Sequence, residues 1–298
     1  MARWILLMVL FSACSGPVDQ ALVTKKAACD GGPLLLGTSF GSYDELKSCV
    51  DIRYDRNSVI LSHHGLGGVS SCTLTDGVTE HEIKAANEGS MFTKLKLLTR
   101  APMLALDRED IQRAFLLSRR KPILFGEGDV AFYDLAYEMM YNIDRLYAGI
   151  QYKNHFTEKG FVNTFNHFLS QAVITALFSE RLADFIADSH ELARIPELVN
   201  GNFSQKQLED LDNGVVDNYV DLLNNEFGQE FGKQMKTKYQ LNRNANWDYA
   251  LMTAFLNEAQ SYAAASFGIA FEPFRSSEIE VIRFTDKVNA VMFDISSY

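Results

Sequence analysis

Apolar residues recur at helical spacing over most of the chain from about residue 81 onward. Acidic residues within 107–110 are typical of a helix N-terminus, and Pro122 should end the helix that begins there. The stretch 161–194 is strongly helical and contains no proline before Pro196. Further helices are predicted over 126–150, 215–238 and 246–267, and after a capping-box sequence at 204–207.

The two ends of the chain follow a different pattern. Residues 30–80 are rich in Gly, Ser, Thr and Asp, and short apolar runs predict strands at 59–61 and 69–74. His63 and His64 lie between these runs beside glycines, which favours a polar turn over a site. Residues 280–284 and 289–295 predict two more strands that pair with the N-terminal ones. The predicted fold class is α+β, mainly α: a helical body with a small sheet from the N- and C-terminal regions.

The first fourteen residues predict an export signal. Arg3 precedes the short apolar stretch 4–11, which is too short to span a membrane, and small residues lead to Cys14. The ending resembles a bacterial lipobox, although Phe11 stands where leucine is usual. We therefore expect acylation of Cys14, for example with palmitate, and a bacterial outer-membrane lipoprotein that is periplasmic or surface-exposed, because Ser15 and not aspartate follows. The alternatives are an ordinary signal peptide or a secreted eukaryotic protein with a sequon at 202–204.

Composition and charge narrow the function classes. The 298 residues are 47% hydrophobic, which excludes disorder and allows a sizeable core. The net charge of −10 repels phosphate backbones, so we expect no nucleic-acid partner. These patterns divide the chain into a signal peptide with lipobox at 1–14, a tether at 15–30, an N-terminal α+β region at 31–125, a helical domain at 126–240, and a C-terminal helix with two strands at 241–298.

Three cysteines follow the predicted lipidation site. An oxidising compartment allows one disulfide among Cys29, Cys49 and Cys72 and leaves one cysteine over. Cys49 and Cys72 flank strand-like sequence, so we favour that pair. The sequence contains no C-x-x-C motif and gives no support for thiolate zinc binding.

Polar residues gather in the helical centre. Asn163, His167 and Gln171 recur every four residues and share one helix face. His190 follows His167 by 23 residues, which on one straight helix would separate them by roughly 35 Å. A break near Ser179 would instead fold the chain into a helical hairpin in which the two histidines face each other. On the second arm, His190 shares a face with small and apolar residues and is predicted to be buried, whereas Glu191 points about 100° away, toward Asp184 and Asp188.

The helix predicted over 215–238 carries a second polar stripe. Asp217, Asp221, Asn224 and Asn225 fall within roughly a third of its circumference, together with Gly228. A glycine within a helix costs about 1 kcal/mol relative to alanine, which a close helix contact or a bound ligand would offset.

These groups have a limited chemistry. Histidines with carboxylates can ligate a divalent metal, or a carboxylate can act as general acid or base while histidine orients it and amides hold substrate. The structural alternative is a satisfied core histidine and asparagines that join helices. The candidate catalytic residues are His167, His190, Glu191 and Asp221, the candidate substrate-binding residues are Asn163, Asn224 and Asn225, and a divalent metal would use His167, His190 and Asp221.

Three short stretches of the sequence, called blocks below, resemble the sequence of a known domain. They read Asn-Thr-Phe-Asn-His at 163–167, Ala-Asp-Ser-His-Glu at 187–191 and Asp-Leu-Leu-Asn-Asn-Glu-Phe-Gly-Gln at 221–229. Over about 155–235 the chain resembles an uncharacterised bacterial helical domain that recurs at the C-termini of RHS-type polymorphic toxins. Asn166 and Gln229 stand where that domain has arginines. If those arginines hold an anionic group, the chain lacks this clamp, and a non-catalytic role is open.

The resemblance makes 126–240 a toxin-like domain and, with the compartment, implies an envelope-acting hydrolase. Its substrate would be a phospholipid, a lipid-linked precursor or peptidoglycan. The alternative is a non-catalytic outer-membrane lipoprotein that binds a partner in assembly, adhesion or self-protection. In both cases the chain would meet the membrane through a lipid anchor.

Overall fold

The centre of the fold is a helical hairpin packed on a third helix. The hairpin consists of α10 (Asn163–Leu177) and α11 (Glu180–Arg194), and α13 (Val215–Lys238) crosses both of its arms. The computed structural model describes residues 32–65 and 68–293. The predicted signal peptide and tether, with Cys14 and Cys29, lie outside this part of the chain.

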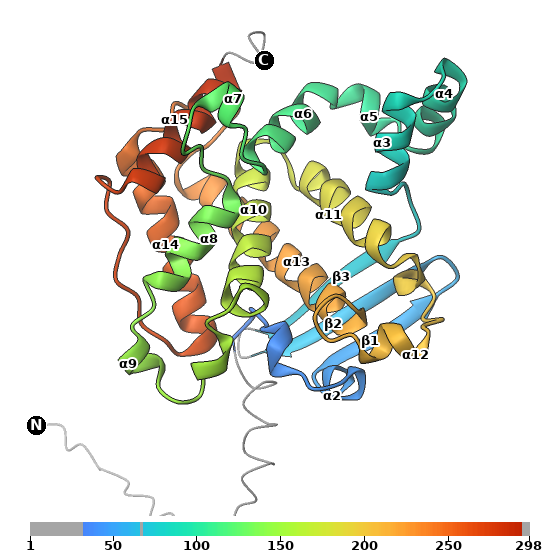
Figure 1. Cartoon of the computed structure of the whole chain (residues 1–298), viewed down its shortest axis with the longest axis horizontal. Coiled ribbons are helices and arrows are strands. Elements are labelled where there is room, and N and C mark those ends of the chain that lie inside the picture. The colour runs from blue at the N-terminus through green and yellow to red at the C-terminus, as the bar shows by residue number, and fades with distance from the viewer. Residues whose placement is uncertain (1–31, 66–67, 294–298) are drawn as a thin grey trace, which may run out of the picture.

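The predicted break at Ser179 is confirmed. Ser179 is the N-cap of α11, and its side chain accepts a hydrogen bond from the backbone N–H of Leu182. The backbone leaves the helical region one residue earlier, at Phe178, where ψ is −93°. The turn folds α11 back along α10 (Figure 1). His167 and His190 consequently line the same pocket.

Glycines allow α13 to approach α10 closely. A Cβ atom at Gly228 would lie 2.4 Å from the backbone oxygen of Phe168, and one at Gly232 would lie 2.5 Å from that of Ala172. Both distances are too short for any side chain. Of the two alternatives expected at Gly228, the close helix contact is present, and it draws the polar stripe of α13 against the polar face of α10.

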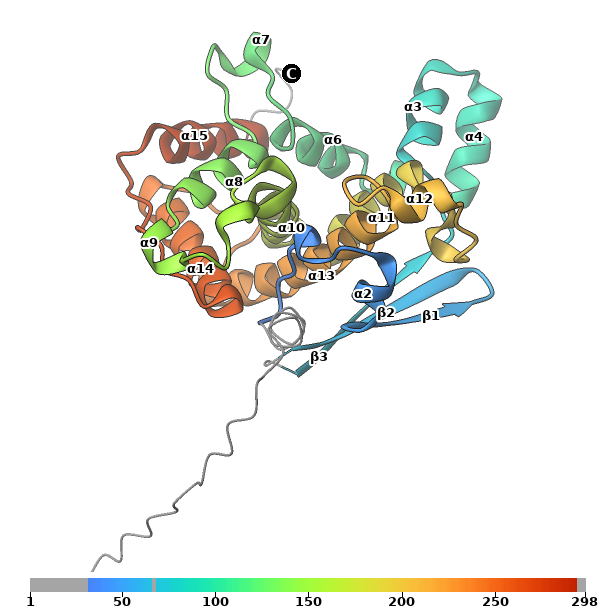
Figure 2. The same cartoon turned by 60° about the horizontal axis from the view of Figure 1, so that its bottom comes forward.

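Within the described residues, the sheet has three antiparallel strands, β1 (Val50–Asp55), β2 (Ser58–Gly65) and β3 (Gly68–Thr75). The sheet lies against α13 (Figure 2). Burial alternates along β2, where Val59, Leu61 and His63 face the core. The polar-turn interpretation of the histidines is therefore wrong: both belong to β2, and the buried His63 meets the ring of Phe227 edge-on.

The predicted C-terminal strands are also wrong, because residues 279–293 form one helix, α15 (Ile279–Phe293). Its buried residues Val281, Phe284, Val288 and Val291 follow helical spacing, and no glycine or proline separates the two apolar runs. Residues 294–295 lie outside the described part of the chain. The sheet is built from the N-terminal region, and β1 is a strand that the sequence pattern did not reveal.

The cysteine pairing differs from the prediction as well. Cys49 is disulfide-bonded, whereas Cys72 is a free and buried cysteine. In the sheet, Cys72 is the register partner of Leu61, and its side chain belongs to the core. The predicted Cys49–Cys72 pair is therefore wrong.

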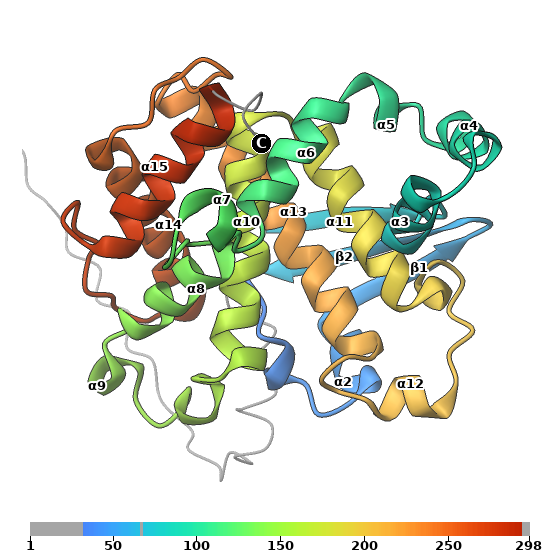
Figure 3. The same ribbon diagram turned by 45° about the horizontal axis from the view of Figure 1, so that its top comes forward.

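Other helices cover the hairpin on two sides. On one side lie α8 (Phe132–Tyr141), α14 (Tyr249–Phe267) and α15 (Figure 1). On the other side an arm of four helices arches over α11 (Figure 3): α3 (Glu80–Glu88), α4 (Met91–Arg100), α5 (Met103–Leu106) and α6 (Arg108–Leu117). One core of buried apolar side chains, from Leu34 to Met292, runs through the described parts of the chain.

The remaining elements are short, and two of them change predicted boundaries. Pro122 begins a helical turn and does not directly end the preceding helix, which stops at Leu117. The helix predicted over 126–150 is reduced to α8 and the short α9 (Arg145–Ala148). None of the described helices is long and apolar enough to cross a membrane. The short elements are η1 (Gly37–Ser39), α2 (Tyr43–Lys47), α7 (Pro122–Phe125), α9 (Arg145–Ala148), η2 (Lys153–His155), η3 (Glu158–Val162), η4 (Pro196–Val199) and α12 (Gln205–Glu209).

Candidate functional site

His167, Glu191 and Asp221 form a buried cluster at the centre of the three helices. They come from α10, α11 and α13, so each of the three sequence blocks supplies one member. The Nε2 atom of His167 lies 3.2 Å from Oδ2 of Asp221. One ligand atom from each residue lies within 4.8 Å of the other two. The two carboxylates are each only 1% exposed, whereas the His167 side chain is 15% exposed.

Two asparagines orient the cluster. The Nδ1 atom of His167 lies 3.0 Å from Oδ1 of Asn225, which can only accept, so this ring nitrogen carries the hydrogen. Nε2 is thereby directed at the carboxylates. On the other side, the amide of Asn163 donates to Oδ1 of Asp221 at 2.8 Å and to Oδ1 of Asp217 at 3.3 Å. The predicted residues Asn163 and Asn225 therefore both lie beside the cluster.

Glu191 is the member without partners. Neither of its carboxylate oxygens has a hydrogen-bond partner among the described residues, and its side chain is buried. A buried carboxylate without a partner is costly, because burial removes the water that stabilises its charge. The Nδ2 atom of Asn225 is also buried without a hydrogen-bond partner among these residues. The cluster thus has unused ligand and donor atoms.

The close approach of several carboxylates changes the pKa values of the cluster. Burial and the Asp221 carboxylate raise the pKa of Glu191. Burial, followed by Asp221, also raises the pKa of Asp217. Burial alone would lower the pKa of His167, but attraction to Asp221 outweighs it and raises this pKa to about 9. The side chains of Glu191, Asp217 and His167 therefore tend to hold protons, and a bound cation would take the place of those protons.

Two cations that the sequence pattern did not indicate lie at the edge of this group. Lys159 Nζ is 3.6 Å and an Arg194 guanidinium nitrogen 3.9 Å from Oδ2 of Asp217. Asp217 was visible as a member of the polar stripe, four residues before Asp221. Lys159 and Arg194 lie outside the three blocks, and only the ends of the hairpin bring them together.

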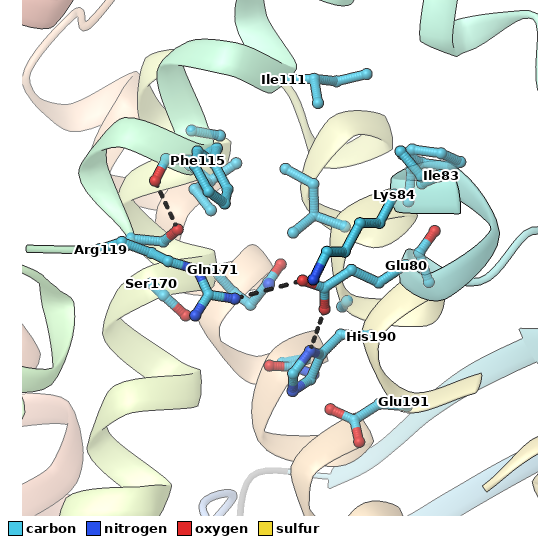
Figure 4. A pocket seen from close by; sticks show the side chains of 18 of the residues that line it. Glu80, Ile83, Lys84, Ile111, Phe115, Arg119, Ser170, Gln171, His190 and Glu191 are labelled. Atoms are coloured by element: carbon cyan, nitrogen blue, oxygen red, sulfur yellow. Dashed lines mark hydrogen bonds and ion pairs between the residues drawn. The ribbon is translucent and has the colours of Figure 1, made fainter. Parts of the chain in front are cut away.

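His190 is not a member of the cluster. Its Nδ1 atom lies 2.9 Å from Oε2 of Glu80, whose other oxygen meets Arg119 at 3.3 Å (Figure 4). The His190 side chain is 38% exposed, so the prediction that it is buried is wrong. The side chain is partly buried, and this partial burial lowers the pKa of the imidazole. The face of α11 that carries His190 opens toward the arm, whereas the face that carries Glu191 packs on the other two helices. The cluster is therefore not the predicted metal set, because Glu191 takes the place of His190.

Asn224 has a structural role. Its Oδ1 accepts a hydrogen bond from the backbone N–H of Leu35 at 3.0 Å, and its Nδ2 donates to the Leu35 carbonyl at 2.9 Å. The side chain is fully buried and lines neither the large pocket between the hairpin and the arm nor the small pocket near β3. Its amide fixes the segment that leads into the sheet, and the substrate-binding role predicted for Asn224 does not fit this position.

A pocket of about 1540 Å³ opens above the cluster, between the hairpin and the arm. His167, His190 and Glu191 line it, together with Asn163 and Asn225. A second pocket of about 240 Å³ lies near β3, where Asp184 and Asp188 meet Glu226. Asn225 borders both pockets. Glu191 belongs to the first one, and therefore does not join Asp184 and Asp188 as its helical direction had suggested.

Asn166 and Gln229, which stand where the RHS-type toxin domain has arginines, have different surroundings. Asn166 lines the large pocket. Gln229 is buried, and its Nε2 donates to Oε1 of Gln171 at 3.2 Å. Arg194 and Lys159 also line the large pocket, so cations are present although the two expected arginines are absent. No family model matches the chain, and no curated protein or solved structure matches it either.

The arrangement can support two kinds of chemistry. Imidazole and carboxylate ligands suit a divalent cation, and three protein ligands with an open position are typical of catalytic metal sites. Asn225 then has the position of a residue that fixes the tautomer and direction of a ligating histidine. The unpartnered Glu191 oxygens fit this use. Without a metal, the same residues could exchange protons as general acid and base.

Proposed function

We propose that this chain is a metal-dependent hydrolase of the bacterial envelope, and that His167, Glu191 and Asp221 hold one divalent cation. The observation that carries the proposal is the buried and unpartnered carboxylate of Glu191, directed into a cluster with His167 and Asp221 beneath a large pocket. A cation there would neutralise acids that otherwise need protons, and when bound it would make a water molecule a better nucleophile.

The residues around the cluster have separate tasks in this proposal. Asn225 and Asn163 hold His167 and Asp221 in place. Arg194 and Lys159 attract the negative part of the substrate. During hydrolysis the scissile bond to the leaving oxygen breaks, the water oxygen forms the new bond, and one water proton ends on the leaving oxygen. His190, which lines the pocket and is oriented by Glu80, is placed to carry that proton.

The test combines metal content with turnover. The full-length protein is incubated with Zn²⁺ or Mn²⁺, dialysed and analysed for metal, and then given phospholipid vesicles, a lipid-linked precursor or peptidoglycan. We expect metal binding and one hydrolysed substrate, and loss of both in Glu191→Gln. The matched control is Asp188→Asn, which changes a carboxylate one turn away that lines only the small pocket. Absence of bound metal, or equal behaviour of wild type and Glu191→Gln on all three substrates, overturns the proposal.

The envelope location and the resemblance belong to the same proposal. The expected lipoprotein is tested by incorporation of radiolabelled palmitate, which should disappear in Cys14→Ser. Incorporation would also exclude the secreted eukaryotic alternative. The likeness to the RHS-type toxin domain is supported by the convergence of its three blocks on one cluster.

A partner-binding lipoprotein is the second candidate. It is favoured by large apolar side chains exposed on α4, where Met91 is 88% and Phe92 77% exposed. In that case one envelope protein should bind stoichiometrically, and His167→Ala should leave the binding unchanged. Loss of binding in Phe92→Ser together with no metal-dependent turnover would establish it in place of the hydrolase.

A further inference from the structure

The two ends of the large pocket differ in chemistry. The end that contains the His167 cluster is polar. It lies where the N-terminal part of α10 and the C-terminal part of α11 meet. The other end lies toward the turn of the hairpin and beneath the arm. Its wall is mainly apolar and includes Leu97, Leu98, Leu104, Ile111, Ile174 and Ile186, and the arm also contributes Lys84, Lys94 and Arg108. Figure 4 shows Ile83, Ile111 and Phe115 on the side of the pocket opposite His190 and Glu191.

The dimensions fit an elongated ligand. Ile174 lies seven residues beyond His167 on α10, which corresponds to a rise of about 10 Å along the helix between these two positions. The volume of about 1540 Å³ exceeds the roughly 300–1,000 Å³ of common small-molecule sites. A compact polar substrate would leave the apolar end empty.

The charge of the pocket differs from that of the whole protein. The chain carries a net charge of −10, yet its pocket is lined by six basic side chains and by three acidic ones, Glu80, Glu158 and Glu191. This local excess attracts a negative ligand. Lys159 and Arg194 lie at the polar end beside Asp217, and Arg119 pairs with Glu80 next to His190. The other three basic residues, Lys84, Lys94 and Arg108, belong to the arm.

We infer that the pocket binds one acyl chain that ends in a phosphate headgroup, with the chain against Ile111 and Ile174 and the phosphate beside Arg194 and the His167 cluster. This names the substrate class for the proposed hydrolase and rests on that function only for the cleavage step. A lipid phosphate uses both ends of the pocket. Inorganic phosphate uses the polar end only, and peptidoglycan lacks the long apolar part that the wall would cover.

Binding of alkyl phosphates to the full-length protein tests the inference. Hexyl, octyl, decyl and dodecyl phosphate are titrated as monomers by calorimetry, beside inorganic phosphate and the uncharged dodecyl maltoside. Each pair of added methylenes should tighten binding about tenfold while the chain still reaches new apolar wall. Inorganic phosphate and dodecyl maltoside should each bind at least tenfold more weakly than dodecyl phosphate. Equal binding of inorganic and dodecyl phosphate, or no dependence on chain length, overturns the inference.

Matched variants locate the ligand. Ile111→Asn places a polar group in the apolar wall, and its control is Ile123→Asn at a residue that is 98% exposed and outside the pocket. Arg194→Gln removes a cation of the polar end, and its control is Arg275→Gln at an exposed residue elsewhere. Both pocket variants should weaken dodecyl phosphate binding about tenfold, and neither control should. Leu98→Asn repeats the wall test in case Ile111→Asn unfolds, and unchanged binding in the folded wall variants contradicts the inference.

The same titration separates this inference from the proposed function. Glu191→Gln should abolish turnover and still bind dodecyl phosphate. Chain-length-dependent binding without any turnover in wild type would support the ligand class and contradict the hydrolase. Metal-dependent turnover of soluble substrates that ignores chain length would support the hydrolase and contradict the ligand class.

Discussion

The Nε2 atom of His167 on α10 lies 3.2 Å from Oδ2 of Asp221 on α13. This contact depends on Gly228, since a Cβ atom two turns further along α13 would lie 2.4 Å from the backbone of α10. The glycine lets the helices approach, and the approach lets an imidazole on one helix reach a carboxylate on the other. Helix packing and site geometry therefore have one cause.

The first prediction concerns that glycine. Gly228→Ala should lower the free energy of unfolding by about 1–3 kcal/mol, because the new methyl group must push two packed helices apart. Urea unfolding at constant pH measures the change. The control is Gly77→Ala, where the nearest neighbour of the added methyl group would lie 3.5 Å away. A Gly228→Ala protein as stable as wild type would show that α13 is not held against α10 in solution.

The second prediction separates two adjacent asparagines. Asn225→Ala should weaken divalent-metal binding about 10- to 100-fold, because His167 loses the acceptor that fixes its ring. Asn224→Ala should keep the metal affinity but lose about 1–3 kcal/mol of stability, because the buried backbone of Leu35 loses both of its partners on this side chain. Calorimetric metal titration and urea unfolding of both variants measure the contrast. If Asn224→Ala weakened metal binding and Asn225→Ala lowered only the stability, Asn224 and not Asn225 would be the residue that supports the metal site.

The third prediction is a pH dependence of stability. Burial, with Asp184 and Glu226 nearby, raises the pKa of Asp188 to about 8, far above its ordinary value near 3.8. Between these values the folded protein holds a proton that the unfolded chain releases, so stability falls as the pH rises from about 4 to about 8. Burial and Asp184 raise the pKa of Glu226 to about 7, which adds a change of the same sign.

Asp188→Asn should remove part of this pH dependence. The amide needs no proton to stay neutral, so at pH 8 the variant should exceed wild type in stability by about 2 kcal/mol, with a smaller difference at pH 5. Urea unfolding at both pH values measures it, and Asp51→Asn at an exposed residue of β1 serves as control. If wild type and Asp188→Asn change equally between the two pH values, Asp188 does not titrate in this window.

Local signals predicted much of the helical part of the fold. The spacing of His167 and His190 predicted the hairpin, and Ser179 caps its second arm. The pattern gave α13 its observed bounds, and Gly268, in the left-handed conformation with φ of 62°, ends α14 as expected. The helix α15 was missed because its β-branched and aromatic residues satisfy a strand pattern over five residues and a helical one only over fifteen.

The candidate site was predicted in its residues more than in its arrangement. His167, Asp221, Asn163 and Asn225 meet as expected from their stripes. The exchange of His190 for Glu191 could not be foreseen, because neighbouring residues on a helix point about 100° apart. Which of them enters the cluster depends on the side from which α13 packs. The large pocket depends on the position of the arm, and no periodicity in one helix specifies how it lies over another.

The last prediction concerns His190, which lies outside the cluster but lines the pocket. His190→Ala should lower hydrolysis at least about 100-fold, the usual contribution of one positioned proton carrier, and leave the bound metal unchanged. Glu80→Gln should have a smaller effect in the same direction, because its side chain can still accept a hydrogen bond from Nδ1 but loses its charge. Turnover and metal content are measured together, with His64→Ala at an exposed position of β2 as control. Loss of metal in His190→Ala would make His190 a ligand, as the sequence first suggested, and unchanged turnover would remove it from the reaction.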